Sequence, residues 1–179
     1  GDDAGALADM DAIIHLDPDC ADAFLEKGVI YSGQEKFPEA LAAIDKAISI
    51  DPNAANYYCH RAMTMSSPAI DSGNHSVLRE ALGYLDEAIR LEPKNAESFF
   101  KRGLIYGVLG ERELELADFS TAIALDPDYA AAYKQRFECL SESGDKEQAN
   151  RDWAQYCART AKEDLINLPD GKRQHYSTN

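Results

Sequence analysis

The sequence is poor in the features that mark disulfide scaffolds, zinc proteins and membrane proteins. Its 179 residues include 4 cysteines, with no CxxC pair and no zinc-site spacing. Four cysteines spread this widely do not form a disulfide framework, so free thiols are expected. No apolar run reaches the roughly 18 residues of a membrane span, which predicts no membrane insertion. Nothing at the start resembles a signal peptide, so the cytoplasm is the expected compartment.

Basic residues are also scarce. Lys and Arg number 18 against 32 Asp and Glu, which gives a formal net charge of −14. A general nucleic-acid binder needs a basic footprint for phosphates, so no nucleic-acid partner is expected. Residues 1–50 hold 11 acids and 3 lysines, so much of the excess lies in the N-terminal part. That excess fits either a solvated acidic face or the docking of a basic partner.

The chain lacks the convergent groups that catalysis requires. It has no Gly-rich phosphate loop and no GxSxG turn, and its four histidines have no partner at metal-binding spacing. Cys59 and His60 are adjacent, but neighbouring residues on a helix point about 100° apart, which separates a nucleophile from its base. We therefore expect no enzyme activity, no catalytic residue, no metal and no cofactor within this chain.

The chain does contain a repeat. The prolines of four similar tripeptides lie 34, 41 and 34 residues apart, and each follows a helical pattern. Self-similarity at such a period predicts an array of stacked helical hairpins. The tripeptides are Leu16-Asp17-Pro18, Ile50-Asp51-Pro52, Leu91-Glu92-Pro93 and Leu125-Asp126-Pro127.

Aligned on these prolines, the units carry the same residue types in the same phase. Position 1 is set at Ala21, Ala55, Ala96 and Ala130. Position 4 is then always aromatic, position 8 is small in three units, and position 24 is large, so two helices can approach closely. The residues after three of the prolines, Asp19, Asn53 and Asp128, are the expected N-caps of the next helix. Lys94 follows Pro93 and breaks this pattern, so Asn95 is the expected N-cap there.

Three units depart from the pattern, the second by a seven-residue insertion and two others by residue type. Phe137 stands at position 8 of the last unit, with Trp153 and Tyr156 at its positions 24 and 27. These aromatics are interpreted as a terminal cap in preference to a ligand site. Glu115 replaces the alanine at position 20 of the third unit.

The pattern resembles the tetratricopeptide repeat (TPR) family over about residues 6–160. The resemblance implies an all-α fold, a right-handed superhelical solenoid of antiparallel helix pairs with a concave groove. It implies a half repeat at 1–20 that supplies only a second helix, so the chain is expected to be part of a longer protein. Full repeats are expected at 21–54, 55–95, 96–129 and 130–168, the last with an extended capping helix. An inserted loop is expected at about 66–76 and a flexible tail at 169–179.

In the family, the first helix of each repeat lines the concave groove. Exposed apolar residues on that face often mark a partner surface, here for an extended peptide or a helix. The alternative is that these side chains pack between neighbouring repeats or beneath other segments. Carried over residue by residue, the resemblance gives the partner-binding candidates Leu25, Val29, Cys59, His60, Met63, Phe100, Lys101, Leu104, Lys134 and Gln135.

Chaperone-binding members of the family clamp a C-terminal carboxylate with Lys and Asn at positions 5 and 9 of one repeat. No repeat here carries that pair, so a chaperone-carboxylate clamp is not expected. The leading hypothesis is a non-catalytic scaffold or adaptor that binds a peptide or helical segment of a protein partner. The alternatives are a targeting or regulatory segment of a larger enzyme, and a module that self-associates through its exposed N-terminal edge. The residues at positions 5 and 9 are Leu25/Val29, Cys59/Met63, Phe100/Leu104 and Lys134/Glu138.

Overall fold

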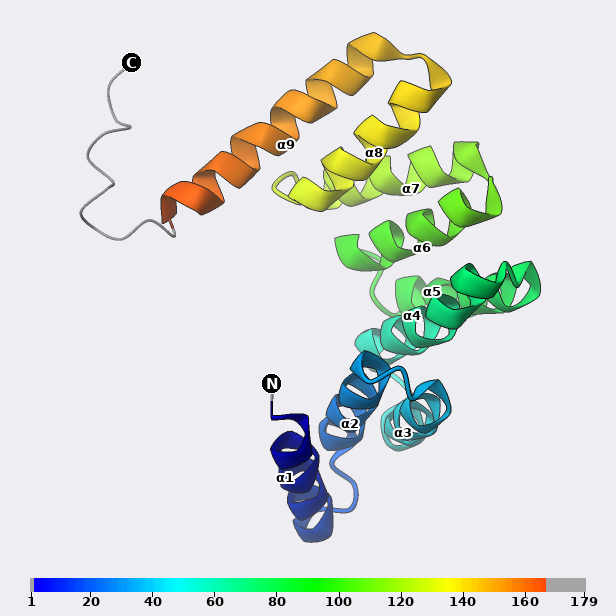
Figure 1. Ribbon diagram of the computed structural model, residues 1–179, viewed down its shortest axis with the longest axis vertical. Coiled ribbons are helices and arrows are strands. Elements are labelled where there is room, and N and C mark those ends of the chain that lie inside the picture. Colours follow the sequence, from blue (N-terminus) through cyan, green and yellow to red (C-terminus); the bar gives the residue numbers. More distant parts are fainter. Residues whose placement is uncertain (1, 167–179) are drawn as a thin grey trace.

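The computed structural model of the protein describes residues 2–166, with side chains described up to residue 161. Within that part the chain forms nine α-helices in a curved stack, and no strand (Figure 1). The predicted all-α solenoid is confirmed, whereas the tail expected at 169–179 lies outside the described residues. The helices are α1 Asp3–Leu16, α2 Ala21–Gly33, α3 Phe37–Ile50, α4 Ala55–Ser72, α5 His75–Leu91, α6 Ala96–Leu109, α7 Arg112–Leu125, α8 Ala130–Ser143 and α9 Lys146–Ile166.

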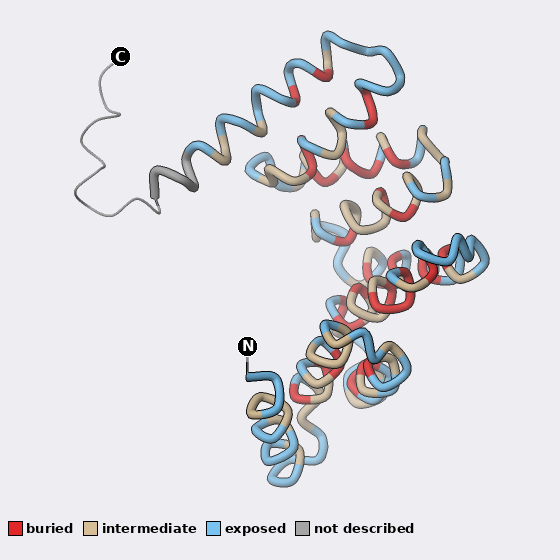
Figure 2. The backbone as a smooth tube through the Cα atoms, viewed as in Figure 1, coloured by how far each residue is buried: buried red, intermediate tan, exposed pale blue. Residues whose placement is uncertain are grey.

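The helices pack in sequential pairs joined by short loops. α2 packs on α3, α4 on α5, α6 on α7 and α8 on α9, while α1 packs on α2. Neighbouring pairs meet through α3 and α4, α5 and α6, and α7 and α8. The first helices α2, α4 and α6 also touch in turn, so they share one side of the stack. The buried residues follow the middle of the stack, and α1 contributes none of them (Figure 2).

Small residues set the spacing within each pair. A Cβ added to Gly28 on α2 would lie 2.5 Å from Ile44 Cγ1 on α3. One added to Gly103 on α6 would lie 2.8 Å from Phe119 Cε1 on α7. Ile44 and Phe119 are both fully buried, so each fills the space that the glycine opposite leaves open.

The acidic residue before each proline ends one helix and shapes the turn to the next. Asp17, Asp51 and Asp126 are C-caps, and each side chain accepts a hydrogen bond from the backbone N–H two residues later. The N-caps expected at Asp19, Asn53 and Asp128 are therefore wrong, since these residues donate within the turn. Asn95 is a true side-chain cap, because it accepts from the N–H groups of Glu97 and Ser98.

The loop predicted at about 66–76 is wrong. α4 continues to Ser72, α5 begins at His75, and the turn is only Gly73 and Asn74. Gly73 has φ 66°, a left-handed conformation that glycine adopts without strain. Seven inserted residues make almost two helical turns, so α4 and α5 lengthen together and their buried faces stay in phase. Ala69 and Leu78, from the added turns, accordingly lie in the core.

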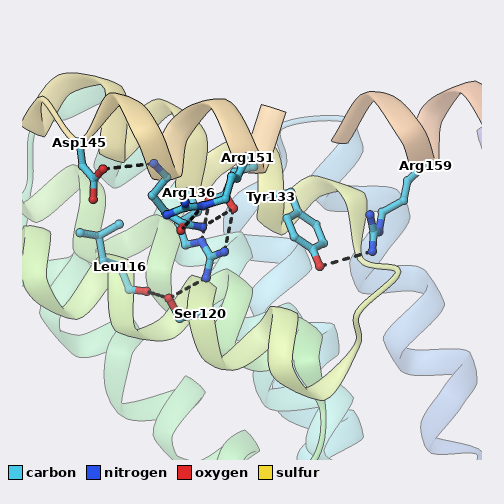
Figure 3. A network of polar contacts seen from close by, with 9 residues as sticks. Leu116, Ser120, Tyr133, Arg136, Asp145, Arg151 and Arg159 are labelled. Carbon is cyan, nitrogen blue, oxygen red and sulfur yellow. Dashed lines mark hydrogen bonds and ion pairs between the residues drawn. The ribbon is translucent and has the colours of Figure 1, made fainter. Parts of the chain in front are cut away.

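Each repeat carries a basic residue at position 7, on its first helix. This residue contacts the second helix of the preceding repeat. Lys27, Arg61 and Arg102 each pair with the aspartate 16 residues earlier, at 2.5, 2.6 and 2.7 Å. Arg136 donates instead to Ser120 Oγ, also 16 residues earlier, and holds the buried Asp152 through Nε and Nη2 at 2.7 and 2.8 Å (Figure 3). These side chains therefore fix how successive pairs are aligned.

Neighbouring residues leave space for the buried Glu115 side chain and form polar contacts with its carboxylate. Gly107 lies opposite, where an added Cβ would come within 2.7 Å of Glu115 Oε1. Arg112 pairs with the carboxylate at 3.2 Å, and the Cys139 thiol donates to it at 3.3 Å. Beside the carboxylate, burial raises the pKa of the Cys139 thiol to about 11, so the thiol stays protonated.

Replacing glycine by alanine is expected to lower the folding stability at one helical position and to raise it at another. Gly103→Ala should destabilise the fold by about 1–3 kcal/mol, because its methyl group would overlap the buried Phe119 ring. The matched Gly83→Ala on α5 meets no atom within 4 Å and should stabilise by up to about 1 kcal/mol. Urea unfolding of both variants measures the difference, and equal shifts would contradict close packing at Gly103.

Removing the Arg136 side chain tests the links between pairs. Arg136→Met should destabilise by about 3 kcal/mol, because Asp152, with its side chain 2% exposed, would lose its cation. The control Arg151→Met removes an exposed arginine of the same region, paired with Glu147, and should change stability by less than about 1 kcal/mol. Thermal and urea unfolding report both variants, and a comparable loss in the control would rule out a special role for Arg136.

Candidate binding groove

The predicted groove residues divide into packed and accessible sets. Leu25 and Cys59 are 5% and 4% exposed. Leu25 packs in a core cluster with Ile44 and Tyr57, and the Cys59 sulfur lies 3.3 Å from Ser98 Oγ on α6. Both therefore pack between neighbouring repeats, which is the alternative that the sequence left open.

Phe100 and Lys101 on α6 are also engaged by other parts of the chain. The Phe100 ring lies 5.7 Å from the Phe119 ring and 5.0 Å from the Tyr129 ring. Lys101 pairs with Glu97 at 2.7 Å, and its side chain is only 16% exposed. This stretch of the groove is therefore largely filled by its own side chains.

The remaining candidates on α6 and α8 are partly accessible. Leu104 and Gln135 are half-buried and Lys134 is exposed. Lys134 lies 3.7 Å from the Glu138 carboxylate, one turn further along α8. A surface pair of this kind is weak, so Lys134 can exchange partners.

An open cavity brings three predicted residues together. Val29 on α2 and His60 and Met63 on α4 line a space of about 210 Å³. Val29 is 36% exposed, so the cavity opens to solvent. Its remaining walls are Ser32, Gly33 and Thr64, which sequence reasoning did not select. Ser32 and Gly33 stand at positions 12 and 13 of the first repeat, on the first helix that the resemblance assigned to the groove, but nothing in the sequence marked Thr64.

The cavity combines apolar walls with hydrogen-bonding groups. Val29 and Met63 supply the apolar surface, while the Thr64 hydroxyl donates to the Ser32 hydroxyl over a long 3.5 Å. Pro68 has no N–H, so it offers no helical hydrogen bond to the Thr64 carbonyl one turn earlier. The site can thus hold an apolar group and satisfy a polar atom at its edge.

His60 is a neutral imidazole near neutral pH. Burial is the main cause that lowers its pKa below 6.5, and the nearby Lys101 ammonium lowers it further. The carboxylates of Glu97 and Glu26 oppose this shift. A neutral imidazole presents one hydrogen-bond donor and one acceptor to the cavity.

The adjacent Cys59 is not an activated nucleophile. Burial raises the pKa of its thiol, with smaller opposing effects from Ser98 and Lys101. A protonated, buried thiol is a poor nucleophile. The described residues also contain no group of three or more His, Cys, Asp or Glu side chains that could hold a metal ion.

A larger depression of about 550 Å³ lies away from the cavity, at the loops that precede α6 and α8. Burial raises the pKa of Tyr129 in its wall to about 12. None of the predicted groove residues lines this depression. Its walls are Lys94, Asn95, Ala96, Glu97, Leu125, Asp126 and Tyr129.

Among the helices that the structure describes, none combines the length and the apolar character that crossing a membrane requires.

Stacked antiparallel helix pairs with a shared inner side define a helical-repeat protein of the kind that acts as a protein interaction module. The sequence matches the tetratricopeptide repeat family at residues 21–54 and again at residues 75–130. The chain belongs to this family. The repeat boundaries given above stay predictions.

Known proteins share both sequence and fold with the chain. Mouse DnaJ homolog subfamily C member 7 is 30% identical over 115 residues, which cover 64% of this chain and 22% of that protein. The Hsp70-Hsp90 organizing protein of Triticum aestivum is 25% identical over 123 residues, 69% of this chain and 20% of that protein. The chain thus spans about a fifth of the length of these curated relatives.

A solved structure shows the same fold. TTC0263, a TPR protein of Thermus thermophilus, superposes with a TM-score of 0.77 at 20% sequence identity. The match covers 88% of this chain and 82% of that chain. At this identity the likeness concerns the fold alone.

The lowered pKa of His60 predicts a pH-dependent stability. Its unfolded-state pKa of about 6.5 lies above its folded-state pKa, so the unfolded chain binds the proton more tightly. Stability should therefore fall as the pH drops from about 7.5 through 6.5, and His60→Gln should remove part of that fall. Urea unfolding at about pH 7.5 and 5.5 measures it. The matched control, His15→Gln, changes an exposed histidine on α1, and identical pH profiles for the two variants would contradict the assignment.

Proposed function

We propose that the chain is a non-catalytic adaptor whose concave groove captures a peptide or helical segment of a protein partner. One observation carries the proposal: an open cavity between α2 and α4 joins three residues that the repeat register assigned to the groove. Those residues are Val29, His60 and Met63. Among the other predicted groove residues, Leu25, Cys59 and Phe100 pack against neighbouring repeats, whereas Leu104, Lys134 and Gln135 remain at least partly accessible.

The exposed apolar groups on the inner helices support this function. Val29 on α2 is 36% exposed and Val108 on α6 is 41% exposed. Single exposed apolar residues are common on any surface. Val29, however, shares a concave site with Met63 and with hydrogen-bonding groups, which is how peptide side chains are anchored.

The names of two curated relatives refer to DnaJ and to Hsp70 and Hsp90, which raises the question of a chaperone partner. The inner face does not favour a carboxylate clamp here. At position 5 of the first three repeats stand Leu25, Cys59 and Phe100, which pack against other residues and carry no charge. We therefore propose a protein or peptide partner that is bound without such a clamp.

The other predicted arrangements stay predictions. A regulatory role within a larger enzyme would use the same proposed groove. Self-association would act through α1, where Ile13 and Leu16 are 39% and 84% exposed. The groove is the better-supported site because it combines shape, apolar area and polar groups.

The groove can be tested with a displayed library of random peptides of about 12 residues, long enough to cross several helices. Peptides selected on the intact chain should shift backbone NMR signals on the inner faces of α2 and α4. Val29→Gln should weaken the best peptide by about tenfold, because it removes apolar contact at the cavity.

Leu114→Gln is the matched control. Leu114 is 46% exposed and lies on α7, which is the second helix of its pair. It should leave peptide affinity unchanged. Failure to select any peptide, or signal shifts confined to α3, α5 and α7, would refute capture in the concave groove.

A further inference from the structure

Acidic side chains flank the cavity on α2. Glu26 precedes Val29 by three residues, so the two share one helix face. Glu26 and Asp22, one turn earlier, are exposed. The Glu26 carboxylate also acts on the His60 imidazole across the space between α2 and α4, because it opposes the lowering of the His60 pKa. The α2 edge of the cavity therefore carries two exposed carboxylates, and the Lys101 ammonium acts on His60 from the α6 side.

The lysines of this region do not neutralise that face. Residues 1–50 contain 11 acids and 3 lysines. Lys27 pairs with Asp11 on α1 at 2.5 Å. Lys36 and Lys46 lie 6.0 and 5.8 Å above aromatic rings of their own region. Each of these ammonium groups therefore has a contact of its own in this region, which leaves Glu26 open to a cation from a ligand.

Cations on the later helices also have acidic partners, and among the pairs named here only the exposed Lys134–Glu138 pair is weak. Lys101 is paired with Glu97 and mostly buried, and Lys134 lies near Glu138. Arg61 on α4 pairs with Asp45 at 2.6 Å and stacks on the Tyr84 ring at 3.9 Å. An anionic peptide would have to separate the Lys101–Glu97 and Arg61–Asp45 pairs, whereas a cationic peptide meets exposed carboxylates directly.

We propose that the α2/α4 cavity is an anchor pocket for one large apolar side chain of a cationic peptide, with the neighbouring Lys or Arg of that peptide held by Glu26. This inference rests on the proposed function and names the chemistry of its partner. Asp22 extends the anionic edge, although one of its oxygens already accepts a hydrogen bond from the Tyr57 hydroxyl at 2.7 Å.

The dimensions and polarity of the pocket fit this ligand. Its volume of about 210 Å³ exceeds the roughly 150 Å³ that holds a benzene molecule in an apolar protein cavity, so an aromatic or branched side chain fits. His60 is neutral near pH 7 and does not repel the adjacent cation. The Ser32 and Thr64 hydroxyls can accept a polar edge, such as that of a tyrosine.

Two glycines allow a matched test of the pocket. A Cβ added to Gly33 meets no atom within 4 Å, so Gly33→Leu can place a side chain into the cavity without disturbing the core. Gly83 on α5 is equally open and lies outside the cavity, so Gly83→Leu is the control. Leucine favours helix more than glycine does, so both variants should unfold at or above the temperature of the unchanged chain.

The probe is the displayed random-peptide library, selected in parallel on the unchanged chain, Gly33→Leu and Gly83→Leu. We expect the unchanged chain and the control to enrich peptides with a large apolar residue close to a Lys or Arg. A synthetic peptide of that sequence should lose about tenfold in affinity on Gly33→Leu. Gly33→Ala, which adds one methyl group, should lose less.

The charge component is measured separately. Glu26→Gln should weaken the same peptide by about threefold and flatten the dependence of its affinity on salt. Replacing the Lys or Arg of the peptide by Gln should have the same effect on the unchanged chain. Binding to the Glu26→Gln protein should then be insensitive to that peptide change.

The outcomes separate this inference from the proposed function. Peptides that shift inner-face NMR signals yet bind Gly33→Leu and the unchanged chain equally would overturn the pocket and leave groove binding standing. Enrichment of acidic peptides would overturn the preference for cations. If no peptide is enriched on any variant, the proposed function fails, and the pocket fails with it.

Discussion

The whole array depends on how closely the two helices of a pair approach. At Gly28 and Gly103 the opposing Ile44 and Phe119 leave no room for even a methyl group. The first helices α2, α4 and α6 also contact one another in turn, so these three pairs present their first helices on the same side of the stack. In the last pair Phe137 occupies the small-residue position, and its ring lies 5.1 Å from Trp153. Trp153 is consequently 44% exposed, where its counterparts in the preceding pairs are fully buried.

Close packing sets the distance within a pair, but it does not align one pair with the next. That alignment comes from charged side chains on the first helices, which contact the second helices of two successive repeats. Arg102 contacts Asp86 on α5 and Asp118 on α7, so a single guanidinium joins two pairs. The paired aspartate side chain at 118 is 7% exposed, and hydrogen bonds of this kind have strong directional preferences. Apolar contact supplies the cohesion of the stack, and these arginines limit its sliding.

The sequence predicted the helix pairs well, because their periodicity comes from contacts inside one repeat. It failed at the insertion, where Ser66, Pro68 and Gly73 resemble a loop in composition. Seven residues fit two helical turns, and that length mattered more than composition. The accessible groove positions were harder to predict. The exposure of a side chain on one first helix depends on which residue faces it from the first helix of the next repeat. Cys59 is buried because Ser98 lies opposite, a pairing 39 residues away that no local pattern reveals.

The position of the cavity follows from the same dependence on facing residues. Between α4 and α6 the Cys59 sulfur lies 3.3 Å from Ser98 Oγ, so the two helices are in direct contact there. Between α2 and α4 the facing residues include Gly33, which has no side chain to fill the space. A cavity created by a missing side chain has no positive motif in the sequence. It becomes recognisable only once the packing of the surrounding helices is known, because only then is the unfilled position distinguishable from an ordinary surface glycine.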